Sequence, residues 1–162
     1  MKKNISIQIE GLKETLKKFD NSKKEILKAI DYGTWRAALH YKGSVQSAIA
    51  GNDGFKSAVD TGYFRERVYA IKSGFATANV GSNQEYSIYL EYGTSPHFVA
   101  PKNKKALSWG KGIQKFFSKG HMVSGIKPRR YFTKTLMMQE ENMKKIVQLE
   151  VNKVIKKTQK PI

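Results

Sequence analysis

Apolar and polar positions alternate at the N-terminal end of the chain. Ile5, Ile7 and Ile9 are separated by polar residues, and this period of two predicts a half-buried β-strand over residues 4–10. Gly11 ends the alternation, and apolar residues then recur at helical spacing at Leu12, Leu16 and Phe19. We therefore expect a strand followed by a short helical segment.

Two longer stretches carry the three- and four-residue spacing of amphipathic helices. From about Ser22 to Ile49 the apolar positions keep this spacing, which predicts one long helix. The spacing starts again at Tyr131 and continues to Ile155, which predicts a final helix. Residues 156–162 are expected to fray, since they form a polar chain end.

Three segments between these helices have the composition of β-strands. They cover residues 65–72, 75–80 and 86–92, and short turns separate them, which predicts an antiparallel meander. Glu91 lies in the last segment between apolar neighbours, so we expect it to be partly buried. An acid or metal-ligand role is one interpretation of this carboxylate. A structural role is favoured, in which Glu91 pairs with an Arg or accepts backbone N–H groups of the turn at Gly93.

Residues 95–130 contrast with the segments before them. Glycine and proline punctuate this stretch, so it is expected to be a long basic loop with one short strand at residues 106–109. Loops of this length are usually functional or disordered. The whole pattern predicts a single α+β domain over residues 1–155. Its small antiparallel sheet, formed by the N-terminal strand and the meander, is packed by the long helix and the C-terminal helix.

The composition agrees with one folded domain. The chain has 162 residues, enough for one ordinary core, and its aromatic content of 11% is higher than disordered chains have. It has no cysteine, which excludes disulfides and thiolate metal sites. Neither a signal-peptide pattern nor a run of about 18 apolar residues is visible, so we expect a soluble protein.

Positive charge is concentrated in the predicted loop. The net charge is +17, and no acidic residue lies between Glu91 and Glu140. A block of this kind repels itself and tends to extend unless a polyanion or an acidic protein surface receives it. The basic residues of this interval are Lys102, Lys104, Lys105, Lys111, Lys115, Lys119, Lys127, Arg129, Arg130 and Lys134.

The candidate catalytic residues do not form a known constellation. His40, His97 and His121 lie far apart in the sequence, and none has a metal-binding spacing. His97 and His121 could meet if the loop folds back, with Glu85 or Glu91 as a third ligand. The sequence has no phosphate-loop or nucleophile-elbow pattern. We therefore expect no enzyme, no catalytic residue, no metal site and no cofactor.

Nucleic-acid binding is a stronger alternative. Phe98, Trp109, Phe116 and Phe117 are interleaved with the lysines of the loop, as in proteins that bind single strands through a basic groove with stacking rings. The same aromatic residues could instead anchor the loop to the core. Both interpretations remain open from the sequence.

Three motifs together resemble a known family. Residues 60–66 (DTGYFRE) are similar to a TG-x-L-R entry to a sheet, residues 86–94 (YSIYLEYGT) to a YA-x-Y-V-E-x-GT strand, and residues 125–132 (GIKPRRYF) to a P-x-R-P-F-L lead into a last helix. In this order and spacing they resemble the neck or tail-component proteins of long-tailed bacteriophages, which join head and tail or complete the tail. The resemblance implies a structural role for the following motif residues: Gly62, Tyr86, Glu91, Gly93, Thr94, Pro128 and Phe132.

This resemblance implies a structural virion protein without catalysis. It implies a position at the head–tail junction, reached from the host cytoplasm during assembly, with no membrane contact. The expected partners are neighbouring head-completion and tail proteins, copies of the same chain in a ring, and packaged DNA. The pairs Tyr63-Phe64 and Arg130-Tyr131 and the length of the loop depart from the family pattern.

A mechanistic hypothesis follows from these expectations. The segment 86–92 and the long helix form a rigid platform, Gly93 permits a tight exit, and the loop orders on contact with partners. Arg129 and Arg130 tie the loop to the final helix or to an acidic neighbour. The residues expected to bind partners are Lys102, Lys104, Lys105, Lys111, Lys115, Lys119, Arg129 and Arg130.

Overall fold

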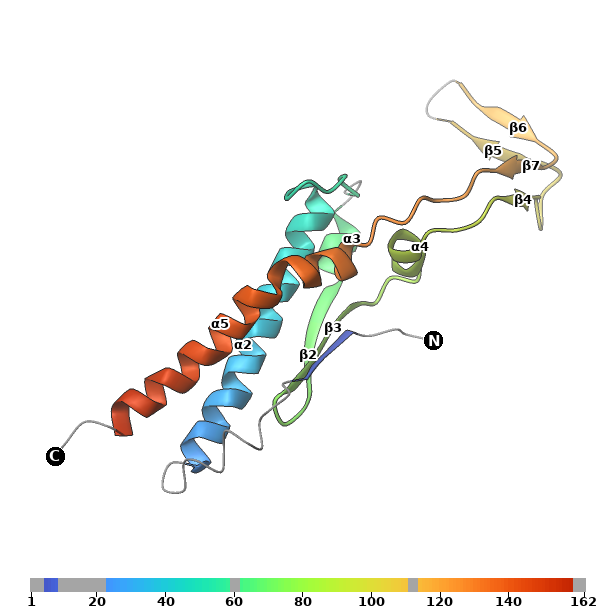
Figure 1. The fold of residues 1–162 in the computed structure, drawn as a ribbon. Coiled ribbons are helices and arrows are strands. Elements are labelled where there is room, and N and C mark those ends of the chain that lie inside the picture. The colour runs from blue at the N-terminus through green and yellow to red at the C-terminus, as the bar shows by residue number, and fades with distance from the viewer. Residues whose placement is uncertain (1–4, 9–22, 59–61, 111–113, 159–162) are drawn as a thin grey trace.

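The computed structural model describes residues 5–8, 23–58, 62–110 and 114–158. Figure 1 shows two long helices beside a small sheet, and a thin arm that projects from them. The body contains β1 (Ile5–Gln8), α2 (Lys23–Ala50), α3 (Tyr63–Glu66), β2 (Val68–Gly74), β3 (Thr77–Ser82), α4 (Ser87–Tyr92) and α5 (Tyr131–Thr158). The arm contains β4 (His97–Val99), β5 (Leu107–Trp109), β6 (Phe116–Ser118) and β7 (His121–Val123). The predicted α+β class is confirmed.

The two long helices lie side by side and run in opposite directions (Figure 1). They approach closely at Gly33, where a Cβ atom would lie 3.0 Å from the Cα atom of Val147. Both predicted helices are confirmed, and α5 continues through residues 156–158 instead of fraying there. The predicted helical repeat at residues 12–19 and the chain end at 159–162 lie outside the described residues. Among the described helices, none is long and apolar enough to span a bilayer.

The core lies between α2, α5 and one face of the sheet. Tyr41 of α2 is fully buried, and its hydroxyl donates a hydrogen bond of 2.8 Å to the carbonyl oxygen of Phe132. Burial, together with the nearby charge of Glu91, raises the pKa of Tyr41 well above its usual range, so the hydroxyl stays neutral. The other side chains of this core include Val45, Ala48, Ile49, Phe64, Val68, Ala78, Val80, Tyr131 and Met143.

The sheet has the strand order β1-β3-β2 and is antiparallel throughout. Val80 is central, because it pairs with Ile5 on one side and with Ala70 on the other. The predicted third strand of the meander is wrong, since residues 87–92 form helix α4. Aromatic and β-branched composition favours strands, but tertiary packing decides between the two states. The helical turn directs Leu90 and Glu91 inward together, which an alternating strand would not do.

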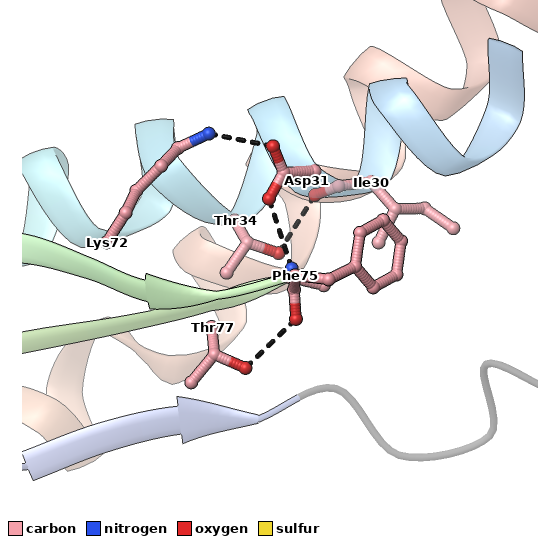
Figure 2. A network of polar contacts seen from close by, with 7 residues as sticks. Ile30, Asp31, Thr34, Lys72, Phe75 and Thr77 are labelled. Atoms are coloured by element: carbon pink, nitrogen blue, oxygen red, sulfur yellow. Dashed lines mark hydrogen bonds and ion pairs between the residues drawn. The ribbon is translucent and has the colours of Figure 1, made fainter.

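A polar network joins α2 to the turn between β2 and β3 (Figure 2). The Asp31 carboxylate accepts a hydrogen bond of 2.7 Å from the Lys72 ammonium and one of 3.1 Å from the backbone N–H of Ala76. Ala76 is buried and has a φ of +49°, a conformation that costs energy for a residue with a side chain. The hydrogen bond from Lys72 is the main reason why the pKa of Asp31 is lowered. Asp31 therefore holds the strained turn against the helix.

The arm contains more secondary structure than the loop that the sequence predicts. Strands β4 and β7 form one antiparallel ladder, and β5 and β6 form a second. The predicted short strand near Trp109 is confirmed as β5. Figure 1 shows both ladders at the far end of two extended segments that leave the body beside α4.

Candidate functional site

The base of the arm brings together two segments that are distant in the sequence. The backbone N–H of Thr94 donates a hydrogen bond of 2.9 Å to the carbonyl oxygen of Ile126. In return, the backbone N–H of Ile126 donates 2.9 Å to the hydroxyl of Thr94. These reciprocal bonds hold the outgoing and returning segments of the arm together where both leave the body.

Two glycines allow this close approach. Gly93 has a φ of +77°, and a Cβ atom there would lie 2.5 Å from the carbonyl oxygen of Ile126 and 2.9 Å from the Pro128 ring. Gly125 has the same φ of +77°, and its Cβ atom would lie 2.1 Å from the carbonyl oxygen of Thr94. The predicted tight exit at Gly93 is therefore confirmed, and only glycine fits the conformation and the space.

Glu91 connects α4 to the start of α5. Its carboxylate accepts from the backbone N–H of Phe132 at 2.9 Å, from the backbone N–H of Thr133 at 2.8 Å and from the Thr133 hydroxyl at 2.6 Å. The side chain is 5% exposed, so water screens these bonds little. A carboxylate is favoured at this position because the first N–H groups of a helix are unpaired and carry positive dipole charge.

The predicted structural role of Glu91 is thus supported, but the predicted partner is wrong. Glu91 bonds the first turn of α5 and not the turn at Gly93. One sequence signal could have indicated this contact: Arg130 precedes α5, where a helix usually has Ser, Thr, Asp or Asn. A helix start without its own cap needs acceptors from elsewhere.

Arg129 fastens the returning segment to the body. Its backbone N–H donates a hydrogen bond of 2.8 Å to the carbonyl oxygen of Leu90. Its Nη1 donates one of 2.9 Å to the carbonyl oxygen of Ser57. Nη1 also donates 3.1 Å to the Tyr131 hydroxyl. The guanidinium predicted to bind a partner therefore binds within the chain. Arg130 beside it is exposed and has a φ of +54°.

The three sequence motifs converge on one aromatic cluster. Gly62 has a φ of +80° and precedes α3, which directs Phe64 into the core. The Phe64 ring lies 5.5 Å from the Tyr86 ring and 6.1 Å from the Tyr131 ring, measured between centroids. Each motif thus contributes one ring, while Phe132 is buried next to Tyr131. The arm is therefore attached beside an aromatic cluster that includes the buried Phe64 and Tyr131.

The aromatic residues of the arm do not reach this core. Phe98 and Phe117 are 62% and 68% exposed, so these two rings do not anchor the loop to the core, which was one of the two interpretations left open by the sequence. Trp109 stacks on Phe116 with ring centroids 6.1 Å apart and lies 4.9 Å from the His121 ring. This contact joins the two ladders to each other.

The lysines of the arm are exposed and cluster at its connections. None of the ion pairs within the described part of the chain includes one of them. Lys111 lies outside the described residues. The described arm lysines are Lys102, Lys104 and Lys105 between β4 and β5, Lys115 before β6, and Lys119 between β6 and β7.

The two histidines of the arm have different partners and do not form a shared metal site. His97 Nδ1 lies 3.0 Å from the carbonyl oxygen of Ser95, whereas the His121 ring packs on Trp109. His40 Nε2 lies on the body, 3.0 Å from the side-chain oxygen of Gln139. Over the described ranges, no three His, Cys, Asp or Glu side chains are grouped as a metal would require.

Comparison with known proteins finds no match for this chain among family models, curated proteins or solved structures. The resemblance to bacteriophage neck and tail-component proteins thus rests on the three motifs at residues 60–66, 86–94 and 125–132.

Proposed function

We propose that this chain is a structural connecting protein of a bacteriophage or prophage, placed at the head–tail junction. Its body is a rigid support, and its arm reaches a neighbouring protein of the assembly. The observation that carries this proposal is the arm base, where the family-like motifs fix a projecting, basic and apolar ribbon to the core. The proposed location is the virion, and copies of the chain are proposed to form a ring.

The use of buried carboxylates supports a mechanical role. Glu91 was the main candidate for an acid or a ligand, yet three hydrogen bonds commit it to the start of α5. Glu150, also buried, forms ion pairs with Arg36 and Lys153 between and along the long helices. Both carboxylates hold elements of the body together, which is a structural role.

Nucleic-acid binding is the second candidate function. The exposed Phe117 ring and the exposed lysines favour it, since aromatic faces and positive charge bind single strands. Binding of this kind weakens steeply with salt, because lysines that neutralise phosphates release counterions. A titration with random-sequence DNA at several salt concentrations measures that slope directly.

Co-assembly with neighbouring gene products tests the proposed function. The full chain is mixed with the purified products of the adjacent genes, and mass photometry measures the complexes. A variant in which a short Gly-Ser linker replaces residues 97–123 serves as comparison, because the hydrogen-bonded Thr94 and Ile126 already hold the two ends together. Circular dichroism and urea unfolding verify that its body is folded. We expect complexes with the full chain and none with the shortened variant; equal assembly of both would contradict the proposal.

A further inference from the structure

The most exposed apolar side chains of the arm include a matched pair. Phe98 on β4 faces Met122 on β7 across the ladder, and they are 62% and 63% exposed. Directly opposed side chains of an antiparallel pair lie on the same face of the sheet and contact each other. The ladder therefore presents one continuous apolar surface, which we call the Phe98–Met122 face.

The backbone beneath this face holds the Phe98 ring in place. A Cβ atom at Gly120 would lie 2.5 Å from Cζ and 2.8 Å from Cε1 of Phe98. The ring thus lies directly over Gly120, in space that only a glycine leaves open. An aromatic side chain that is ordered before binding loses less entropy when a partner covers it.

Positive charges lie on the chain connections at one end of this ladder. Val99 pairs with His121, so β4 ends where β7 begins. Lys102, Lys104 and Lys105 leave the ladder from this end, and Lys119 enters it there. An apolar centre with a charged rim is the usual anatomy of a protein–protein interface.

The described residues of a second copy of this chain do not offer the arm a matching acidic surface. Within the described residues, most carboxylates are already bound: Glu25, Asp31, Glu140, Glu141 and Glu150 by ion pairs, and Glu91 by the first turn of α5. The remaining described carboxylates are exposed and belong to three different segments, at Asp53, Glu66 and Glu85. A net charge of +17 also disfavours docking of the basic arm on a second copy.

The arrangement of the rings disfavours a nucleic acid. Trp109 contacts both Phe116 and His121, and the Phe98 ring rests on Gly120. Among the described arm rings this leaves Phe117, which is 68% exposed, as the most accessible to a base, whereas single-strand binding stacks several successive bases on rings. Met122 is a flexible thioether that fits irregular apolar recesses of proteins.

We infer that the Phe98–Met122 face binds an apolar segment that is flanked by acidic side chains on a different protein. This inference rests on the proposed function and names the chemistry of the partner that the arm contacts. The lysines at the end of the ladder bind the flanking acidic side chains, and Phe98 and Met122 supply the desolvated centre.

Fluorescence anisotropy with three labelled probes tests the inference. The first is a short synthetic peptide of alternating glutamate and leucine or phenylalanine. The second has serine at every apolar position, and the third is oligothymidylate. We expect the first probe to bind the full chain most tightly at physiological salt. The double substitution Phe98→Ala/Met122→Ala should weaken its binding about tenfold or more.

Matched variants separate apolar from charge effects. Phe75→Ala removes a ring that is 53% exposed at the β2–β3 turn of the body, and it should leave the affinity within about twofold. Gly120→Ala should weaken binding of the first probe only, because it displaces the Phe98 ring. Lys102→Gln/Lys104→Gln/Lys105→Gln should weaken binding of both peptides and flatten the salt dependence.

Several results would overturn the inference. These are failure of the first probe to bind, an affinity unchanged by Phe98→Ala/Met122→Ala, or tighter binding of oligothymidylate. Failure of the proposed function is distinguishable from these results. If shortening the arm abolishes co-assembly with the adjacent gene products while Phe98→Ala/Met122→Ala leaves it unchanged, the proposed function stands and this inference is wrong.

Discussion

At the scale of single residues, Glu91 links the arm base to the final helix. Replacing its carboxylate with an amide in Glu91→Gln removes a charge from the positive end of α5 and leaves one oxygen to accept bonds from Phe132 and Thr133. We expect a loss of about 1–3 kcal/mol in the free energy of unfolding, measured in urea. The exposed neighbour provides a control, since Glu85→Gln should change stability by less than about 0.5 kcal/mol. Equal stability of Glu91→Gln and the unmodified chain would contradict this account.

Gly93 tests the geometry of the arm base. Gly93→Ala places a Cβ atom against the carbonyl oxygen of Ile126 at a backbone angle that disfavours side chains. We expect destabilisation of about 1–3 kcal/mol in thermal or urea unfolding. Gly43→Ala is the matched control, because it lies within α2 with nothing inside 4 Å of the new atom. That substitution should instead stabilise the protein by about 0.5–1 kcal/mol. If Gly93→Ala left the free energy of unfolding unchanged, the close approach of Gly93 to Ile126 and Pro128 would be contradicted.

At the scale of elements, Asp31 makes the contact of α2 with the sheet depend on pH. Its pKa is lowered in the folded state, chiefly by Lys72, so its contribution is complete above the unfolded pKa of about 4. The contribution is lost as the pH falls through the lower folded value. We expect Asp31→Asn to reduce stability by up to about 1 kcal/mol at neutral pH. The difference from the unmodified chain should shrink below about pH 4. Urea unfolding across this pH range measures it, and a pH-independent difference would contradict the role of the charge.

The long elements and the short ones differ in how far the sequence predicts them. Helices α2 and α5 are correctly predicted, because each repeats the helical spacing over 28 residues. Helix α4 was mistaken for a strand, since six residues are too few to distinguish the two periods. The three-residue strands of the arm are shorter still, and only β5 was expected.

At the scale of the whole molecule, the arm should be the first part that a protease attacks. Its lysines are exposed on the connections of two short ladders that are remote from the core, so local opening costs little free energy. We expect limited trypsin digestion of the isolated protein to cut between Lys102 and Lys119 first and to leave α2 and α5 intact. Mass spectrometry of the fragments locates the cuts. An arm that resists cleavage completely would contradict its exposed placement.

The sequence by itself determined the two long helices, most of the central sheet, the uneven charge and the three motifs that meet at the arm base. All of these depend on residues that are neighbours along the chain, so periodicity and composition reveal them. Only the tertiary structure decided what Glu91 binds, where the arm aromatics lie and why Gly93 and Gly125 are required. The answers for Glu91, Gly93 and Gly125 depend on contacts between residues 91–94 and residues 125–133, which meet only when the chain has folded. A local pattern cannot specify such contacts, because their energies belong to pairs of distant segments.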